Sequence, residues 1–203
     1  PVAAPVKRSG HCGNSLVGDK WDRNESSMPL QEELAIQGRW LFRKRSFLPL
    51  LTAPLFILAF HNYGYLLGSH GVDLAWELFC LGISLSGLAV RIVVTGCTPR
   101  RTSGRNTDKG QVADALNTTG MYSQMRHPLY FGNFLMALGP VMFLHVWWLG
   151  LFYVLFFWLY YERIMLAEEQ FLRGKFGQAY EDWAARVPAF FPRLHGWRAP
   201  ELA

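Results

Sequence analysis

The sequence predicts an all-α, polytopic membrane helix bundle, with about four transmembrane helices and with amphipathic helices at the interface on its N- and C-terminal sides. Three observations support this prediction. Hydrophobic residues make up 51% of the 203 residues, and they are gathered into four long apolar segments. Each segment is close to the roughly 20 residues with which a helix crosses a ~30 Å hydrocarbon layer. The Lys and Arg residues lie between these segments or near their edges.

The N-terminal part of the chain precedes the apolar segments. Residues 1–28 are rich in Gly, Ser, Asn, Pro and charge without periodicity, which predicts an irregular or flexible extension. Residues 29–45, PLQEELAIQGRWLFRKR, begin with a Pro and two glutamates and end in a basic cluster. Because these charges suit the two ends of a helix dipole, we predict an amphipathic helix lying at the interface. We treat residues 29–203 as a single membrane-embedded domain.

The apolar segments predict membrane helices at residues 47–67, 74–95, 129–147 and 149–166, followed by a C-terminal segment over residues 167–203. Prolines in the first and third segments would break soluble helices, but neighbouring helices compensate for them in a membrane bundle. For any single segment, the alternative is a buried core helix of a soluble protein. Four such segments together would leave a soluble globule of this size with too little polar surface.

Charge predicts the orientation in the membrane. The connections GSHGVD and HVWWLG contain no Lys or Arg, whereas the loop over residues 96–128 and both terminal regions are basic. Basic loops stay on the cytoplasmic side, so both termini and this loop are predicted to be cytoplasmic. Because the net charge of +5 flanks apolar runs, it favours an anionic membrane surface over nucleic acid as a partner. The oligomeric state is not predicted.

Metal-binding and nucleotide-binding patterns of the usual kinds do not stand out. Cys12, Cys80 and Cys97 are far apart and fit neither a zinc-ligand spacing nor a disulfide framework, so we predict no metal site. No G-x-G-x-x-G follows a predicted strand. The nucleotide-binding arrangement common in soluble enzymes is therefore not expected.

A predicted hairpin brings polar residues together. The HVWWLG turn is so short that the third and fourth membrane helices must run antiparallel. The hairpin returns Glu168 and Glu169 to the level of Tyr122, Arg126 and His127, although about 40 residues separate the two groups. Acidic groups are unfavourable near the C-terminal end of a helix, where we expect this pair. We therefore expect a cation beside the pair, either an arginine or a ligand.

The end of the fourth apolar segment carries further charges, Glu162 and Arg163. Ionisable groups at membrane depth usually face a partner or a cavity. The alternative is that these side chains extend to the interface as ordinary helix-end charges.

The segment before His127 favours a ligand site. The stretch ALNTTGMYS supplies backbone N–H donors, and Tyr122 and Tyr130 supply aromatic faces. A lone interfacial histidine is more often structural. This combination, however, suits a small ligand with hydrogen-bonding groups and a positive centre.

Three motifs follow one another in the second half of the chain: GMYSQMRHPLYFGNFL (120–135), AEEQFLRGKFGQAYEDW (167–183) and VPAFFP (187–192). The stretch that contains them, residues 117–192, resembles the integral-membrane methyltransferases typified by isoprenylcysteine carboxyl methyltransferase and phosphatidylethanolamine N-methyltransferase. The order of the motifs and the spacing from the His-Pro to the glutamate pair carry the resemblance. It covers more than a third of the chain.

The resemblance implies a membrane methyltransferase that binds S-adenosyl-L-methionine at its cytoplasmic face. The acceptor would be a lipid or another membrane-embedded molecule, with a phospholipid headgroup, a lipid phosphate and a prenylated carboxylate all open. In that family, the cofactor is contacted by the His-Pro-x-Tyr element, by the tyrosine before it, by one glutamate and by the preceding backbone. Carried over to this sequence, these are Tyr122, His127, Pro128, Leu129, Tyr130 and Glu168, with Asp114, Ala115, Leu116 and Asn117 from the preceding backbone.

Catalytic roles are assigned to Arg163, Glu169 and Arg126. The prenylcysteine enzymes look to use an arginine a few residues before the glutamate for the acceptor carboxylate. The matching position here is Ile164, one residue after Arg163. The resemblance therefore leaves the acceptor class open.

Two other hypotheses belong to different classes. One is a nicotinamide-dependent membrane enzyme similar to sterol reductases, whose C-terminal ends carry a comparable Arg-His-Pro-like element. The other is a non-enzymatic membrane protein. A binding test separates the three hypotheses. S-adenosylhomocysteine should bind a methyltransferase, NADPH should bind a reductase, and neither should bind a non-enzymatic protein.

Overall fold

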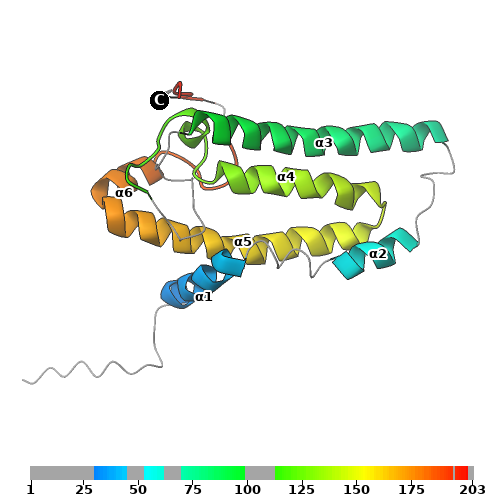
Figure 1. Cartoon of the computed structure of the whole chain (residues 1–203), viewed down its shortest axis with the longest axis horizontal. Coiled ribbons are helices and arrows are strands. Elements are labelled where there is room, and N and C mark those ends of the chain that lie inside the picture. The colour runs from blue at the N-terminus through cyan, green and yellow to red at the C-terminus, as the bar shows by residue number, and fades with distance from the viewer. Residues whose placement is uncertain (1–29, 45–52, 62–69, 99–112, 194, 201–203) are drawn as a thin grey trace, which may run out of the picture.

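The computed structural model describes residues 30–44, 53–61, 70–98, 113–193 and 195–200. Regular structure in these residues is helical (Figure 1), which confirms the all-α prediction for the described part of the chain. The elements in chain order are α1 (Leu30–Lys44), α2 (Ala53–His61), α3 (His70–Cys97), η3 (Gly120–Ser123), α4 (Pro128–Phe143), α5 (Trp147–Phe176) and α6 (Gln178–Ala184). The predicted extension at residues 1–28 lies outside the described residues.

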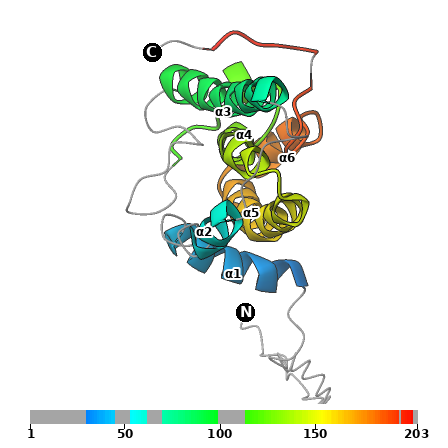
Figure 2. The ribbon, with the colours of Figure 1, turned by 90° about the vertical axis from the view of Figure 1, so that its right-hand side faces the viewer.

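The long helices form a stack in the order α3, α4, α5, with α1 against the outer side of α5 (Figures 1 and 2). Helix α2 packs near the α4–α5 turn, where Ala59 lies in one apolar cluster with Val141 and Leu149. Helix α4 runs antiparallel to α3 and α5 (Figure 1). The end of α3, the start of α4 and the second half of α5 therefore meet at one end of the bundle, which we call the site end.

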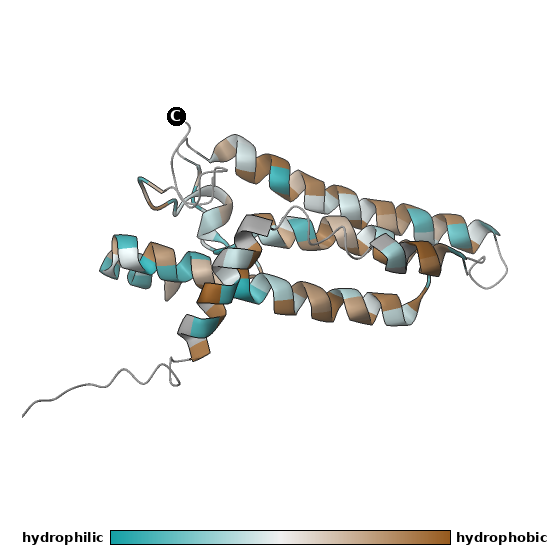
Figure 3. Ribbon diagram, turned by 60° about the horizontal axis from the view of Figure 1, so that its bottom comes forward, coloured by the Kyte–Doolittle hydropathy of each residue, from teal (hydrophilic) through white to brown (hydrophobic). Residues whose placement is uncertain are grey.

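Hydrophobic residues recur along the whole length of the long helices in this stack (Figure 3). Helices α3 and α5 are long and apolar enough to cross a membrane, yet only 17% and 28% of their most apolar 18-residue windows are buried. Large side chains such as Leu78 and Leu155 are more than half exposed. A soluble protein would bury core helices of this composition. The exposed apolar surface indicates a hydrocarbon environment, and the chain is an integral membrane protein.

The number of membrane crossings is only partly resolved by the described helices. Helix α4 has 16 residues and is shorter than a usual span, and the described part of the first apolar segment is the 9-residue α2. The rest of the segment predicted at 47–67 lies outside the described residues. The segment predicted at 129–147 ends early as a helix, at Phe143, because the chain turns there into α5.

Helix α5 is longer than the apolar segment that predicts it. The segment at 149–166 lies inside a 30-residue helix. Residues 167–176 continue the helix because most of them are good helix formers and none is Pro. The helix ends where Gly177 takes a positive φ of 53°. The glutamate pair therefore lies inside α5 rather than at the helix end where we expected it.

Small residues allow α3 and α4 to pack backbone against backbone. A Cβ atom on Gly87 would lie 2.6 Å from the backbone N of Met136 and 2.7 Å from the carbonyl oxygen of Gly132. Close contacts of this kind are typical of membrane helices, where van der Waals packing and hydrogen bonds drive association. Hydrogen bonds that cross the interface include those from Ser84 Oγ to Met136 O and from Trp76 Nε1 to Met142 O, both at 3.0 Å.

We expect Gly87→Ala to destabilise the protein by about 1–3 kcal/mol, because the added methyl group forces the two helices apart. The matched control is Gly82→Ala in the same helix, where a Cβ meets nothing within 4 Å. The control should be neutral or stabilising, since Ala is the better helix former. Thermal unfolding in detergent measures both, and equal melting temperatures for the two variants would contradict this packing.

Candidate active site

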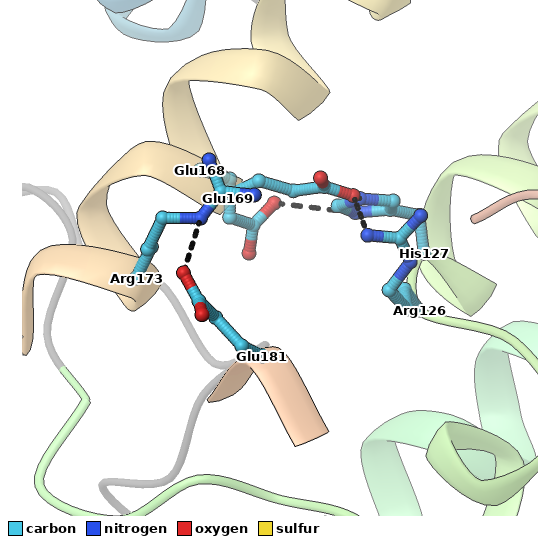
Figure 4. A network of polar contacts seen from close by, with 6 residues as sticks. All are labelled: Arg126, His127, Glu168, Glu169, Arg173 and Glu181. Carbon is cyan, nitrogen blue, oxygen red and sulfur yellow. Dashed lines mark hydrogen bonds and ion pairs between the residues drawn. The ribbon is translucent and has the colours of Figure 1, made fainter. Parts of the chain in front are cut away.

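The glutamate pair of α5 faces the first residues of α4 (Figure 4). Glu168 Oε2 accepts a hydrogen bond from the Tyr130 hydroxyl at 2.9 Å. Glu169 Oε1 lies 3.0 Å from His127 Nε2 and 2.9 Å from Arg126 Nη1. All five side chains are buried or half-buried. The hairpin thus brings together two groups of residues that lie far apart in the sequence.

The two glutamates differ in how their charge is neutralised. Glu169 forms an ion pair with Arg126 and a contact with His127. Among the described residues, no arginine or lysine lies within 4 Å of Glu168, and the nearest basic side-chain atom is His127 Nδ1 at 3.8 Å. Glu168 therefore keeps more of its negative charge available for a bound cation than Glu169 does.

The start of α4 is held by the C-terminal part of the chain. Pro128 occupies the first turn of α4, where its missing N–H costs nothing. The N–H groups of Arg126 and His127 donate to the carbonyl oxygens of Pro188 and Ala189 at 2.9 and 3.1 Å. The VPAFFP motif therefore has a structural explanation, because its backbone fixes Arg126 and His127, the two residues that contact Glu169.

Tyr122 lies beneath this site in η3 and is 5% exposed. Its carbonyl oxygen accepts a hydrogen bond from Trp183 Nε1 of α6 at 3.2 Å. Burial raises the pKa of the Tyr122 phenol well above its ordinary value, and the charge of Glu168 raises it further. Tyr122 is therefore a neutral phenol at any physiological pH.

Two buried polar atoms at this site, Arg126 Nε and the Tyr180 hydroxyl, make no close hydrogen bond among the described residues, although Tyr180 interacts with both Glu169 and Arg126. Burial and the charge of Glu169 raise the pKa of Tyr180, so this group is also a neutral donor. Buried polar groups are nearly always satisfied in folded proteins. Unsatisfied donors beside two carboxylates are the arrangement expected of a site for a polar ligand. Tyr180 lies within the motif AEEQFLRGKFGQAYEDW, but no role for its hydroxyl follows from the sequence.

We expect Tyr180→Phe to leave the melting temperature unchanged or raise it, because the buried hydroxyl that it removes makes no close hydrogen bond among the described residues. We expect the same variant to weaken S-adenosylhomocysteine binding by about 3- to 10-fold, the value of one hydrogen bond. The control is Tyr153→Phe, whose hydroxyl donates to Phe134 O at 2.7 Å, and which should lower the melting temperature instead. If Tyr180→Phe is destabilised and binds ligand normally, the hydroxyl serves the fold alone.

The remaining predicted cofactor residues have different surroundings. Leu116 and Leu129 pack against the apolar cluster that contains Tyr122. Asn117 is buried, and its Oδ1 accepts hydrogen bonds from the backbone N and the hydroxyl of Thr119, which shapes the turn before η3. Asp114 and Ala115 are exposed, and their contact with a cofactor stays a prediction.

Arg163 lies on a different face of α5 from the glutamate pair. Its Nε donates to Gln37 Oε1 of α1 at 3.0 Å, and its Nη1 donates to the carbonyl oxygen of Leu159. The structure therefore brings Arg126 and Glu169 together, but it does not bring Arg163 to them. The assignment of Arg163 to the acceptor stays a prediction that this placement does not favour.

A second arginine, Arg91 of α3, reaches the site end through a polar network that the sequence analysis did not identify. Arg91 Nη1 donates to Asn133 Oδ1, and Asn133 Nδ2 lies 3.3 Å from the Tyr161 hydroxyl. The Tyr161 ring lies 5.1 Å from the ring of Tyr130, the residue that donates to Glu168. A signal was present, since an arginine inside an apolar helix usually faces a partner or a cavity.

Half of the chain, residues 78–179, matches the phospholipid methyltransferase family. The match begins within α3, before Arg91, and ends in the first turn of α6, so it includes the glutamate pair. Within the described residues, no group of three or more His, Cys, Asp or Glu side chains is arranged to hold a metal ion.

Similar curated proteins have two kinds of name. The chain is 38% identical over 90 residues to the nickel-cobalt-cadmium resistance protein NccN of Alcaligenes xylosoxydans xylosoxydans, which covers 44% of this chain and 42% of that protein. It is 33% identical over 120 residues to the protein-S-isoprenylcysteine O-methyltransferase of Schizosaccharomyces pombe, covering 59% of this chain and 49% of that protein. The enzyme of the same name from Mus musculus is 35% identical over 81 residues, which cover 40% of this chain and 29% of that protein. The aligned part thus spans under half the length of these relatives.

One solved structure is also similar, that of the eukaryotic intramembrane Ras methyltransferase isoprenylcysteine carboxyl methyltransferase. The match has a TM-score of 0.47 and 21% identity, and it covers 85% of this chain and 56% of that chain. A likeness at this level carries no argument about fold or function.

Proposed function

Because the chain belongs to the phospholipid methyltransferase family, we propose that it is a membrane enzyme that transfers a methyl group from S-adenosyl-L-methionine to an oxygen of an anionic, lipophilic acceptor. The observation that carries this proposal is the site formed by Glu168, Glu169, Arg126, His127 and Tyr180. Its polar groups match the groups of that cofactor. The isoprenylcysteine enzymes among the relatives are named O-methyltransferases, which favours oxygen as the atom that accepts the methyl group.

The cofactor would be held by complementary charges at the site end. It carries a carboxylate, an amino group, two ribose hydroxyls and a sulfonium centre, and it supplies an electrophilic methyl group. Arg126 Nε and the Tyr180 hydroxyl are buried donors suited to its carboxylate or hydroxyls. Glu168, whose charge is not balanced by an arginine, suits its amino group or sulfonium centre. The ring of Tyr130, stacked 5.6 Å from that of His127, offers an aromatic face to a positive centre.

The anionic group of the acceptor would be held by Arg91. The guanidinium is half-buried on the apolar bundle, and its side-chain partner among the described residues is the neutral amide of Asn133. It therefore carries a positive charge that no described carboxylate balances. A guanidinium fork matches a carboxylate or a phosphate geometrically. Arg91 lies on a membrane helix, so an acceptor with a hydrocarbon tail can reach it from the bilayer.

These residues contribute to the reaction mainly by positioning. Methyl transfer needs the acceptor oxygen in line with the bond that breaks, so fixing both reactants supplies much of the rate. Arg126 and His127 are held rigidly in the cofactor site. Arg126 pairs with Glu169, and the backbone N–H groups of both residues donate to Pro188 and Ala189. The apolar bundle excludes water from the acceptor side. We place the site end in the cytoplasm, on the distribution of Lys and Arg in the sequence.

A ligand-binding and labelling experiment tests this function. We expect S-adenosylhomocysteine, but not NADPH, to raise the melting temperature of the detergent-solubilised protein. We expect membranes that contain the protein, incubated with radiolabelled S-adenosyl-L-methionine, to yield a labelled species in the lipid extract that mild alkali hydrolyses, as it does a methyl ester. Stabilisation by NADPH instead would favour the reductase hypothesis, and an alkali-stable label would exclude a carboxylate acceptor and leave a phosphate oxygen or a nitrogen.

A further inference from the structure

Helix α1 crosses α5 with the two backbones in contact. A Cβ atom on Gly38 would collide with the carbonyl oxygen of Arg163 and would lie 3.0 Å from the Cβ of Ala167. Arg163 and Glu168 are five residues apart in α5, which places them about 140° apart around the helix axis. Helix α1 therefore covers a face of α5 that points away from the glutamate pair.

A cavity of about 680 Å³ lies between the side chains of the two helices at this crossing. Its walls include Trp40 of α1 and Phe156, Leu159 and Tyr160 of α5, and its polar members are Gln37 and Arg163. Trp40 and Leu159 are more than half exposed, so the cavity opens on the apolar outer surface. We call this cavity the α1–α5 groove.

Arg163 gives the groove a positive charge at one end. Its guanidinium contacts the amide oxygen of Gln37 and the carbonyl oxygen of Leu159. No carboxylate of the described residues lies within 4 Å of it. An arginine stays charged under all physiological conditions, and its planar guanidinium can form bidentate hydrogen bonds with a phosphate. The groove thus combines an unbalanced cation with an apolar wall.

The depth of the groove suits a lipid. In α5 the uninterrupted apolar stretch ends at Tyr161, and Arg163 is the first cationic residue after it. Arg163 therefore lies at the boundary between hydrocarbon and headgroups, while Leu159 and Phe156 lie one and two turns deeper.

We propose that the α1–α5 groove binds an anionic phospholipid of the bilayer, with the lipid phosphate at Arg163 and a hydrocarbon chain along Leu159 and Phe156. The bound lipid joins α1 to α5 and stabilises their crossing. This lipid is not the methyl acceptor, because the groove faces away from Glu168. The proposal therefore stands apart from the proposed methyl transfer.

The test measures the melting temperature of the full-length protein in a neutral detergent after addition of lipid. Phosphatidylglycerol should raise the melting temperature of the wild type by about 2–4 °C at saturating concentration. Phosphatidylcholine, which has the same chains but no net charge, should raise it much less. Arg163→Gln should lose the difference between the two lipids, and Arg163→Lys, which keeps the charge without the fork, should keep part of it.

Lys175→Gln is the matched control, since it removes one positive charge from the end of the same helix outside the groove. It should respond to phosphatidylglycerol as the wild type does. An equal response in Arg163→Gln and the wild type would overturn the proposal. So would an equal response to the two lipids, or full stabilisation by inorganic phosphate alone. Binding of S-adenosylhomocysteine to each variant is measured in parallel, so loss of the cofactor site is distinguished from loss of the lipid site.

Discussion

Glu168→Gln is expected to lower the affinity for S-adenosylhomocysteine by about 10- to 100-fold, because it removes a charge-assisted interaction worth about 1.5–3 kcal/mol. Glu168 is buried, and among the described residues no arginine or lysine lies within 4 Å of it. Its carboxylate is therefore the part of the pair that a cationic group of the cofactor can use. The amide oxygen of Gln can still accept the hydrogen bond of Tyr130, so we expect the variant to fold. Isothermal titration of the detergent-solubilised protein gives the affinity.

Two variants on the same helix make this result specific. Glu162→Gln removes an exposed charge six residues earlier and should leave the affinity unchanged. Glu169→Gln removes the partner of Arg126 and His127, so it should lower the melting temperature more than Glu168→Gln does. Equal, small losses of affinity for Glu168→Gln and Glu162→Gln would remove the glutamate from the cofactor site.

The meeting of the glutamate pair with Arg126 and His127 follows from the sequence because it depends on chain geometry alone. Two apolar segments joined by a turn too short to separate them must form a hairpin, and the hairpin fixes which residues return to which level. The extent of α5 does not follow in the same way. The apolar segment ends at Leu166. The helix continues to Phe176, because the residues that follow also have good helix propensity.

The polar network of Arg91 and the α1–α5 groove depend on contacts between helices that are distant in the sequence. The sequence places Arg91 in an apolar segment and Arg163 at the end of another, and either arginine could face a partner or a cavity. Which of them faces the site is decided by helix rotation. Gly38 of α1 packs directly against the backbone of Arg163. Gly87 and Gly132 let α3 and α4 approach closely, so that the Arg91 side chain lies against α4. A pattern of hydropathy contains no information on these rotations.

Arg91→Ala is expected to lower kcat/KM for the lipophilic acceptor by about 100- to 1,000-fold, because it removes the cation that would fix the acceptor in a site of low dielectric constant. Affinity for S-adenosylhomocysteine should change by less than about threefold, since Arg91 contacts neither glutamate in the structure. Arg91→Lys should recover only part of the activity, because an ammonium group lacks the fork. Transfer of radiolabel to the lipid extract gives the rate, and titration gives the affinity.

Arg163→Gln is the control that decides between the two arginines. If Arg91 holds the acceptor, Arg163→Gln keeps most of its methyl-transfer activity in the same detergent, because its guanidinium faces α1. If Arg163 holds the acceptor instead, Arg163→Gln loses methyl-transfer activity and Arg91→Ala keeps most of it. Asn133→Ala adds a second measurement, since Asn133 orients Arg91 without carrying charge. An orienting role predicts a higher KM for the acceptor with little change in cofactor affinity, whereas a purely structural role predicts a lower melting temperature with normal kinetics in the folded fraction.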